Sequence, residues 1–404
     1  MPLPCPPPPS DLCAQFQQLD RLLLALRPYW QLRPFAELQL PWENNPDLQA
    51  FLARLSDEQL DRLEANMQSR TAALAPFIPE VDTLMALSQA QPLPLQRAPL
   101  QDAALSFGVP GRKWQQVTAF CATLPQESLP FLEWCAGKGH LGRVLHRVHG
   151  HPVTSLELQT ELCHAGDRLT QRHGSNCRMQ ACDVLSDEVL QHLQPGQHAV
   201  ALHACGQLHL QLLQQASRQQ VQRVSLSPCC YHLIAADRYQ PLSEHAQASP
   251  LRLSRHDLRL AVQETVTAGA RERRHRDREF HWRLSFDLLQ RILRGKNSYL
   301  NCPAVPRSLL GKRFRDFCAY MAQHKGLTLD PALDYDRFER EGLARTAIVS
   351  RIELVRHLFR RPLELWLVLD RALYLQQQGY RVTVGEFCDY RLTPRNLLIL
   401  ASRT

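Results

Sequence analysis

The 404-residue sequence predicts an α/β fold with a Rossmann-like, doubly wound and mostly parallel sheet. Two observations indicate this fold class. Apolar runs alternate with helical or loop-like stretches, which favours parallel strands with helices on both faces. A glycine-rich segment follows the first run, where such folds place a tight turn between strand and helix. The expected strands are Leu129–Leu132, Val153–Leu158, Met179–Val184, Ala199–His203 and Val221–Leu226.

The sequence on the N-terminal side of these strands predicts helices. Residues 1–10 are rich in proline and are expected to be disordered. Residues 11–100 predict a helical N-terminal domain, because apolar residues recur at helical spacing from Leu12 to Leu26. A capping box at Ser56–Gln59 is expected to open a second helix through Met67.

Residues 110–404 predict the sheet domain, with an insertion at 235–300 where the alternating pattern weakens. A helix at Pro362–Gln378 has proline at its start and glycine after its end, and a strand is expected at Arg381–Phe387. This helix and strand could complete the sheet.

Composition and charge indicate what kind of partner and which cell compartment to expect. The formal net charge is +8, which is compatible with an anionic partner such as RNA. The chain has 13 cysteines and shows no secretory signal, so free thiols in a reducing cytoplasm are expected. The most apolar late stretch, Leu363–Leu375, contains three charged residues, and no membrane span is predicted. The oligomeric state is not indicated.

The glycine-rich segment runs from Glu133 to Gly142. The negative charge of Glu133 limits the kinds of ligand that this segment could bind. Glycines allow a tight turn whose amides approach a ligand closely. Glu133 would repel phosphate but would suit an amine or sulfonium, which favours S-adenosylmethionine (SAM) over a nicotinamide dinucleotide. The expected contacts in this segment are Glu133, Cys135, Gly137, Gly139, Leu141 and Gly142.

Two further acids stand at the ends of the next two expected strands. Glu157 ends the second run, where a carboxylate can accept the ribose hydroxyls of a nucleoside. Asp183 ends the third run, where an adenine amine could be bound. Acids at three successive strand ends beside one glycine turn predict a nucleoside-type cosubstrate site.

The fourth and fifth runs end in motifs rich in cysteine and histidine. These are Leu202–Gly206, with His203 and Cys205, and Ser227–His232, with Cys229 and Cys230. Ligands of open α/β sheets bind at the carboxyl ends of strands, so both motifs are expected to face the glycine loop. His203 is therefore also expected to contact the cosubstrate.

Three chemistries suit these side chains. His203 or His232 could act as a general acid or base. Cys229 or Cys230 could attack a base as a thiolate. The cysteines and histidines also have the right atoms for zinc, but adjacent cysteines are an awkward pair for one tetrahedral ion, and no metal site is predicted. Alternatively, the cysteines pack as small apolar residues.

Substrate contacts are expected at two places. Lys113 and Trp114 join a cation to an aromatic ring just before the sheet, as nucleic-acid grooves do, although this segment could be a plain linker. Pro228 and Tyr231 are loosely similar to a turn that stacks an aromatic ring on a flipped base. The basic run Arg271–Arg278 contains two acids, which is more typical of a solvated helix face than of an RNA contact.

The segments Phe131–Arg143, Leu202–Gly206 and Pro228–His232 resemble a family of class I SAM-dependent methyltransferases. The family includes the methyltransferase-like protein twenty-five type and the glutathione S-transferase C-terminal-domain-containing protein. The segments Leu363–Tyr374 and Arg391–Asn396 are similar to that family's tail. The acceptor-stem tRNA ribose methyltransferases carry a related glycine loop and a paired-cysteine turn with histidine.

The resemblance implies a class I methyltransferase fold with SAM contacts at Glu133, Gly137, Gly139, Glu157 and Asp183. We therefore expect a SAM-dependent methyltransferase that acts on RNA, with tRNA as one candidate and His232 orienting or deprotonating the acceptor. The alternative is a non-catalytic RNA- or protein-binding module that retains the fold. The chain departs from many class I enzymes at Cys135, where they have glycine.

Overall fold

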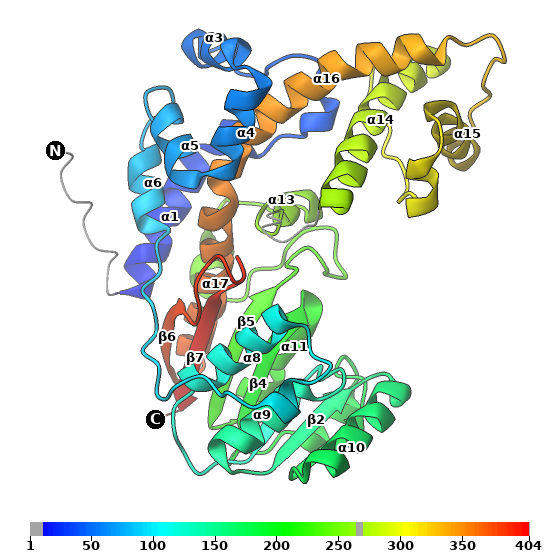
Figure 1. Cartoon of the computed structure of the whole chain (residues 1–404). Helices are drawn as coiled ribbons and strands as arrows, with labels where there is room; N and C mark the ends of the chain where they lie inside the picture. Colours follow the sequence, from blue (N-terminus) through cyan, green and yellow to red (C-terminus); the bar gives the residue numbers. More distant parts are fainter. Residues whose placement is uncertain (1–10, 264–269, 404) are drawn as a thin grey trace. The chain divides into compact units, whose positions relative to one another are not determined.

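The computed structural model describes residues 11–263 and 270–403 (Figure 1). The expected disorder of residues 1–10 lies outside the described part. Internal contacts divide the chain into two compact units, which we call the sheet unit and the helical unit. Among the described residues, the sheet unit comprises residues 11–25, 83–263 and 360–403, and the helical unit comprises residues 26–82 and 270–359.

This grouping cuts across the three segments expected from the sequence. The first helix, α1 (Leu12–Ala25), is grouped with the sheet and not with the other N-terminal helices. The expected insertion at 235–300 is split, because its first part belongs to the sheet unit and its later part to the helical unit.

The sheet has seven strands in the order β3-β2-β1-β4-β5-β7-β6. The first five strands pair in parallel, and β7 is antiparallel to both β5 and β6. The predicted fold class is thus confirmed, and each of the five apolar runs forms a strand. The strands are β1 (Phe131–Trp134), β2 (Val153–Glu157), β3 (Cys177–Ala181), β4 (His198–Cys205), β5 (Arg223–Cys229), β6 (Tyr380–Glu386) and β7 (Leu397–Arg403).

Both predicted C-terminal elements are present, as α17 (Arg360–Gln377) and β6. The sequence did not predict β7, whose short apolar run carries no alternation that would separate a strand from a buried helix. The other helices of the sheet unit are α7 (Ala103–Ser106), α8 (Gly111–Thr123), α9 (His140–His149), α10 (Thr160–His173), η2 (Asp187–His192), α11 (Gln207–Arg218), α12 (Glu244–Ala248) and α13 (Arg255–Leu260).

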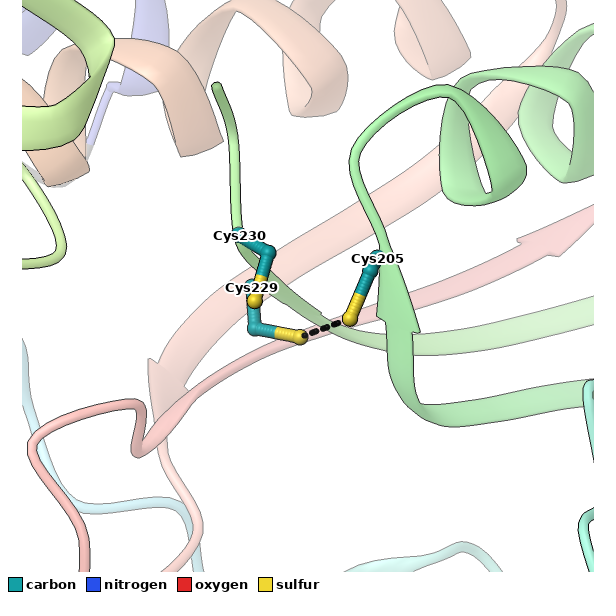
Figure 2. Close-up of side chains that lie close together, drawn as sticks. All are labelled: Cys205, Cys229 and Cys230. Carbon is teal, nitrogen blue, oxygen red and sulfur yellow. Dashed lines mark hydrogen bonds between the residues drawn. The ribbon is translucent and has the colours of Figure 1, made fainter. Parts of the chain in front are cut away.

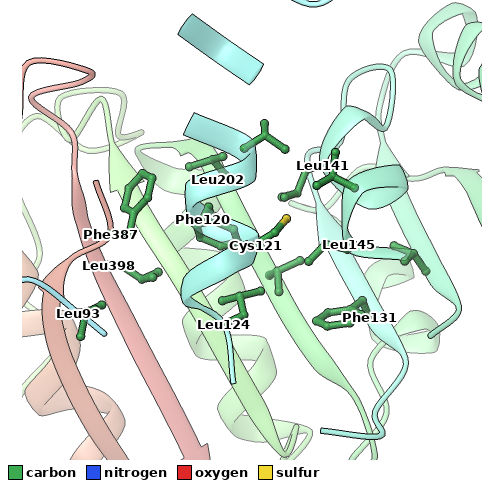
Figure 3. Packing of buried hydrophobic residues seen from close by; sticks show 14 residues of the cluster. Leu93, Phe120, Cys121, Leu124, Phe131, Leu141, Leu145, Leu202, Phe387 and Leu398 are labelled. Atoms are coloured by element: carbon green, nitrogen blue, oxygen red, sulfur yellow. The ribbon is translucent and has the colours of Figure 1, made fainter. Parts of the chain in front are cut away.

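An apolar cluster fixes α8 and α9 against the strands (Figure 3). Phe120 of α8 and Leu145 of α9 are fully buried, and they pack with Phe131 of β1 and Leu398 of β7. Burial of each such side chain stabilises the fold by roughly 1.5–3 kcal/mol. This packing places the first turn of each helix beside the carboxyl ends of the strands.

Two of the charged residues that interrupt the apolar sequence of α17, Asp370 and Arg371, are hydrogen-bonded inside the sheet unit. Asp370 is fully buried and accepts hydrogen bonds from the Tyr239 hydroxyl and from the backbone and hydroxyl of Ser243, at 2.5 to 2.7 Å. Arg371 donates to Nε2 of His209 at 2.9 Å and to the Tyr239 hydroxyl at 3.1 Å. A hydrogen-bonded network therefore replaces solvent around these groups. No described helix is long and apolar enough to cross a membrane.

The helical unit contains the predicted capping box. Ser56 Oγ accepts from Gln59 N at 3.2 Å, and Gln59 Oε1 accepts from Ser56 N at 2.9 Å. The helix ends at Ala65 instead of continuing through Met67, because the Asn66 side chain caps a new helix by accepting from Ser69 N. A second apolar cluster, around Trp282 and Phe317, joins α14 to α15.

The helical elements on the N-terminal side are α2 (Arg27–Trp30), η1 (Pro34–Ala36), α3 (Pro46–Arg54), α4 (Asp57–Ala65) and α5 (Met67–Leu74). The next helix, α6 (Val81–Leu87), spans the sequence boundary between the units, which lies after residue 82. The later elements are α14 (Ala270–Arg294), η3 (Arg307–Gly311), α15 (Phe314–Lys325), α16 (Tyr335–Arg356) and η4 (His357–Phe359).

Candidate functional site

The glycine loop joins β1 to α9 and has three residues in the left-handed backbone region. These are Cys135, Gly137 and Gly139, with φ of 58°, 59° and 64°. Cys135 thus occupies a conformation that favours glycine, so a cysteine at this position strains the backbone of the loop. An added Cβ at Gly137 would meet no heavy atom within 4 Å, whereas at Gly139 it would lie 2.8 Å from Met179 Sδ. Gly137 therefore lines the open face of the loop.

Glu133 is 3% exposed, and its carboxylate supports the loop from below. Oε2 accepts from Gly142 N at 3.0 Å and from Ser155 Oγ at 2.6 Å. An added Cβ at Gly142 would lie 2.6 Å from the same oxygen, so only glycine leaves room for it. Burial raises the pKa of Glu133 to about 7, and the Ser155 hydrogen bond and the Arg143 charge oppose the rise. These contacts assign Glu133 a positioning role.

Glu157 ends β2 beside the glycine loop, because β2 pairs with β1 in the sheet. Its Oε2 accepts from Gly137 N at 2.8 Å, and its Oε1 accepts from Gln159 N at 3.0 Å. Asp183 lies two residues beyond the end of β3, is exposed, and accepts from Leu185 N at 2.9 Å. The predicted row of acids therefore exists, with Glu157 and Asp183 on its solvent side and Glu133 beneath it.

Leu141 is 6% exposed, and its side chain belongs to the apolar cluster of α8 and α9. It therefore packs in the core, and its expected contact with a ligand is not available to the side chain. Arg143 had no role in the sequence analysis, yet it holds the loop by donating to the Lys138 carbonyl at 2.7 Å.

His203 lies where the pairing of β4 with β5 shifts register, and its φ is 70°. Its side chain is exposed, and Nε2 lies 2.8 Å from Oε1 of Gln116. Because the Gln116 amide donates to the Leu392 carbonyl at 3.4 Å, its oxygen faces the imidazole. His203 therefore carries its proton on Nε2, which leaves Nδ1 as a proton acceptor. Surrounding protein atoms and the Lys113 charge lower the pKa of His203.

Gln116 is a site residue that the sequence did not reveal. It is a polar residue on the buried face of α8, and only its place in the folded sheet unit shows its partner. The only feature of the sequence that pointed to this helix was the expected substrate segment Lys113–Trp114, which lies about one turn before Gln116.

Cys205, Cys229 and Cys230 form a cluster at the ends of β4 and β5 (Figure 2). Their three sulfurs lie within 4.8 Å of one another, and those of Cys205 and Cys229 are 3.5 Å apart. Hydrogen bonds from the other two thiols, together with the charges of His232 and Arg395, lower the pKa of Cys230. Hydrogen bonding within the cluster and burial raise the pKa of Cys229.

His232 follows the cluster and is half-buried. Its Nδ1 is shielded from solvent and has no hydrogen-bond partner within the described residues. Burial and the Arg259 charge lower the pKa of His232, while Cys230 raises it. The predicted histidine and thiols of the two motifs therefore do meet at one edge of the sheet.

The predicted base-stacking role of Tyr231 is wrong for this structure. Tyr231 is 0% exposed, its hydroxyl donates to the Pro228 carbonyl at 3.4 Å, and the Arg371 guanidinium lies 5.1 Å from its ring. Pro228 is itself buried inside β5. A ring enclosed by the core leaves no face for a substrate base.

Lys113 and Trp114 belong to the first turn of α8, so the linker interpretation is wrong. Lys113 is exposed, and its charge lowers the pKa of both His140 and His203, which places it within electrostatic reach of the site. Trp114 is half-buried and packs against the apolar cluster. Lys113 thus remains a candidate substrate contact, with part of the Trp114 ring beside it.

The run Arg271–Arg278 lies in α14, and its mixed charges behave as expected for a solvated face. Arg307 pairs with Glu272 at 2.6 Å, and both side chains are largely exposed. A cavity of about 640 Å³ in the helical unit is lined by Arg271 and Arg307 but also by Glu272 and Glu279. This surface is not uniformly basic.

The fold and these residues define the class of protein. A sheet in this strand order, with a glycine loop after β1 and carboxylates at the neighbouring strand ends, is a Rossmann-like class I methyltransferase architecture. A family described as a methyltransferase domain matches residues 112–237, which is less than half of the chain. This match supports an enzyme with a methyltransferase domain.

Several solved structures are similar to the chain over part of their length. Geranyl diphosphate C-methyltransferase from Streptomyces coelicolor A3(2) is 14% identical, with a TM-score of 0.23, over 34% of this chain and 55% of its own. Precorrin-6y C5,15-methyltransferase from Geobacter metallireducens GS-15 is 9% identical, with a TM-score of 0.25, over 30% and 66%. Coclaurine N-methyltransferase is 15% identical, with a TM-score of 0.25, over 53% and 62%. These likenesses bear on neither the substrate nor the activity.

Proposed function

We propose that the protein is a SAM-dependent methyltransferase that acts on RNA, with tRNA as a candidate substrate. One observation carries the first half of the proposal: the Glu157 carboxylate is held at the glycine loop by Gly137 N at 2.8 Å. This bond fixes a carboxylate beside the open face of Gly137, where nothing lies within 4 Å of an added Cβ. A carboxylate in this place suits the paired hydroxyls of a ribose.

The residues present fit SAM along the loop from Gly137 to Gly142. Glu157 would accept from the ribose hydroxyls, and Asp183, exposed beyond β3, would accept from the adenine amine. Glu133 and Gly142 would keep the loop open from below. When bound, SAM supplies an electrophilic methyl group. Positioning the acceptor in line with that methyl group would account for much of the rate.

The acceptor would meet His203 and His232. The Gln116 contact at 2.8 Å leaves Nδ1 of His203 able to accept a proton, so His203 is one candidate base. His232 remains our first candidate for orienting or deprotonating the acceptor, because its Nδ1 has no described partner. Cys229 and Cys230 are further candidates through their thiols, and Cys230 carries the lowered pKa that thiolate chemistry needs.

RNA is supported by charge. The chain has a formal net charge of +8, and Lys113 lies exposed in the first turn of α8, beside the predicted reaction centre. Its charge acts on His203, so a phosphate bound by Lys113 would lie next to the reacting group. The expected cytoplasmic location also stays a prediction.

Isothermal titration tests cofactor binding, and tritiated SAM with purified tRNA or total RNA tests the substrate. We expect SAM binding, and label transfer to RNA that Glu157→Ala reduces by weakening SAM binding. Glu161→Ala is the matched control, because Glu161 is an exposed acid four residues further on. No heat and no thermal shift with SAM or its demethylated product would refute an enzyme. Label on protein or small molecules alone would refute RNA as the substrate.

The burial of Tyr231 favours the alternative of a non-catalytic module, since the expected platform for a base is absent from the described site. Such a module would bind RNA or protein and retain SAM as a structural ligand. Comparison of modified nucleosides in cells with and without the gene separates the two. A missing methylated nucleoside in the deletion supports the enzyme.

A further inference from the structure

We propose that Cys205, Cys229 and Cys230 bind one zinc ion through three thiolates, with a fourth position open toward the carboxyl edge of the sheet. The proposal is independent of methyl transfer, but a bound zinc ion would exclude Cys229 and Cys230 as free thiolate nucleophiles. It also departs from the sequence analysis, which predicted no metal.

The sulfur positions suit one tetrahedral ion. The three Sγ atoms lie within 4.8 Å of one another, and Cys205 Sγ and Cys229 Sγ are 3.5 Å apart. Zinc–sulfur bonds of about 2.3 Å in tetrahedral geometry separate two sulfurs by about 3.8 Å. Side-chain adjustments of less than about 1 Å would therefore close the site around zinc.

The backbone explains how adjacent cysteines can share one ion. Successive side chains of a regular strand point to opposite faces, so two adjacent cysteines within a strand could not bind the same ion. Cys229 is the last residue of β5, and Cys230 turns into the left-handed region with φ of 47°. The alternation is broken there: the Cys229 sulfur points to Cys205 (Figure 2), and the Cys230 sulfur lies within 4.8 Å of both other sulfurs.

The turns that carry the three cysteines are fixed to each other. Gly206 N donates to the Cys229 carbonyl at 3.1 Å, and Gln207 N donates to the Leu233 carbonyl at 2.7 Å. An added Cβ at Gly206 would lie 2.0 Å from the Leu233 carbonyl oxygen, so the turns touch directly. Such contacts hold the ligands in place before the metal binds, which favours binding.

Burial and charge also suit the ion. Cys229 is 4% exposed, while Cys205 and Cys230 are half-buried and reach solvent. Three thiolates and Zn²⁺ leave one negative charge, and Arg395 acts electrostatically on Cys230. Among the described residues, no histidine nitrogen or carboxylate oxygen joins the three sulfurs within 4.8 Å. The fourth position would therefore hold water, as in zinc sites with three protein ligands.

The test measures zinc in the full-length protein, purified under reducing conditions without chelator. We expect one zinc per chain by mass spectrometry, and thiolate-to-metal charge-transfer bands after cobalt substitution. Mutation of a residue that only hydrogen-bonds to a metal ligand typically lowers metal affinity about 10- to 100-fold. Loss of a ligand should cost more, so Cys205→Ser and Cys230→Ser should each lower zinc affinity at least about 100-fold. Cys177→Ser is the control, because Cys177 is a half-buried thiol at the start of β3.

Circular dichroism checks that each variant is folded. The cobalt spectrum of the unmodified protein counts thiolate ligands without any variant, so misfolding cannot hide the answer. Zinc below the background of a metal-free control protein overturns the proposal, as does unchanged affinity in folded serine variants. A disulfide between Cys205 and Cys229 in a reduced preparation that takes up no zinc overturns it too. None of these readouts depends on methylation.

Discussion

The buried carboxylate of Glu133 should make stability depend on pH in an unusual direction. Its pKa rises from 4.5 to about 7 in the folded chain, chiefly because of burial. Between these values the native state keeps a proton that the unfolded state has released. Since the native state then binds more protons, the free energy of unfolding falls as pH rises through this window.

The size of the effect follows from the two pKa values. Their separation corresponds to about 3 kcal/mol, since one pKa unit is equivalent to about 1.4 kcal/mol. This stabilisation is fully present below pH 4.5 and is lost as pH passes about 7. Glu133→Gln removes the titrating group but keeps an oxygen that can accept from Gly142 N and Ser155 Oγ.

Urea unfolding of both proteins at several pH values between 5 and 8 measures the effect. The difference in unfolding free energy between Glu133→Gln and the unmodified chain should shift in favour of the variant by about 2–3 kcal/mol as pH rises. Other titrating groups are common to both proteins and cancel in the difference. Glu161→Gln, an exposed change, should show no such shift. Parallel pH profiles for Glu133→Gln and the unmodified chain would refute the reasoning.

Three substitutions, and a matched control for the first, test other features by urea unfolding. Gly142→Ala should destabilise by about 1–2 kcal/mol and weaken SAM binding, because the new methyl group would crowd the Glu133 carboxylate, at a cost that exceeds the helix propensity of alanine. Gly111→Ala, in an open helix start, should be neutral or stabilising. Cys135→Gly should stabilise by about 1 kcal/mol, because it relieves a left-handed backbone. Asp370→Ala should destabilise by about 3–5 kcal/mol, because it breaks a buried charged network.

Two controls separate these effects from general sensitivity. Cys177→Gly, within the extended backbone of β3, should destabilise, since glycine weakens a strand. Asp187→Ala, an exposed acid, should change stability by less than about 0.5 kcal/mol. Equal stability of Gly142→Ala and Gly111→Ala would contradict the packing beneath the loop. A loss of stability in Cys135→Gly would contradict the strain argument.

Local patterns predicted the parts of the fold that short-range physics determines. The five parallel strands, α17 and the Ser56 capping box follow from apolar runs, helix ends and side-chain spacing. The glycine loop and its acids were also found, because strand ends in a parallel sheet meet at one edge. Local patterns could not predict whether a side chain that follows a distorted turn points into the core or toward solvent. Tyr231 is the example, since it follows the left-handed Cys230 and enters the core.

The remaining gaps come from contacts between distant segments. Gln116 acts through His203, which is 87 residues away in the sequence. Likewise, α1 joins the sheet unit and not the neighbouring helices, because its apolar face packs on α17, where Phe16 meets Trp366. Periodicity indicates that such a helix has a buried face, but it does not indicate which surface covers that face.

Backbone strain is the structural feature that best marks the functional edge. Among described residues, left-handed φ at positions other than glycine occurs at Cys135, His203 and Cys230, and otherwise at Glu80 and Gln220. The first three lie at or near the carboxyl ends of β1, β4 and β5. These three strands are neighbours in the sheet, with β4 between β1 and β5. Glycine would adopt each conformation at lower cost, and strain of this kind gathers where side chains have a function. Cys135 belongs to the glycine loop, His203 is a candidate base and Cys230 is a proposed zinc ligand, so this edge combines the proposed cofactor and acceptor sites with the proposed metal site.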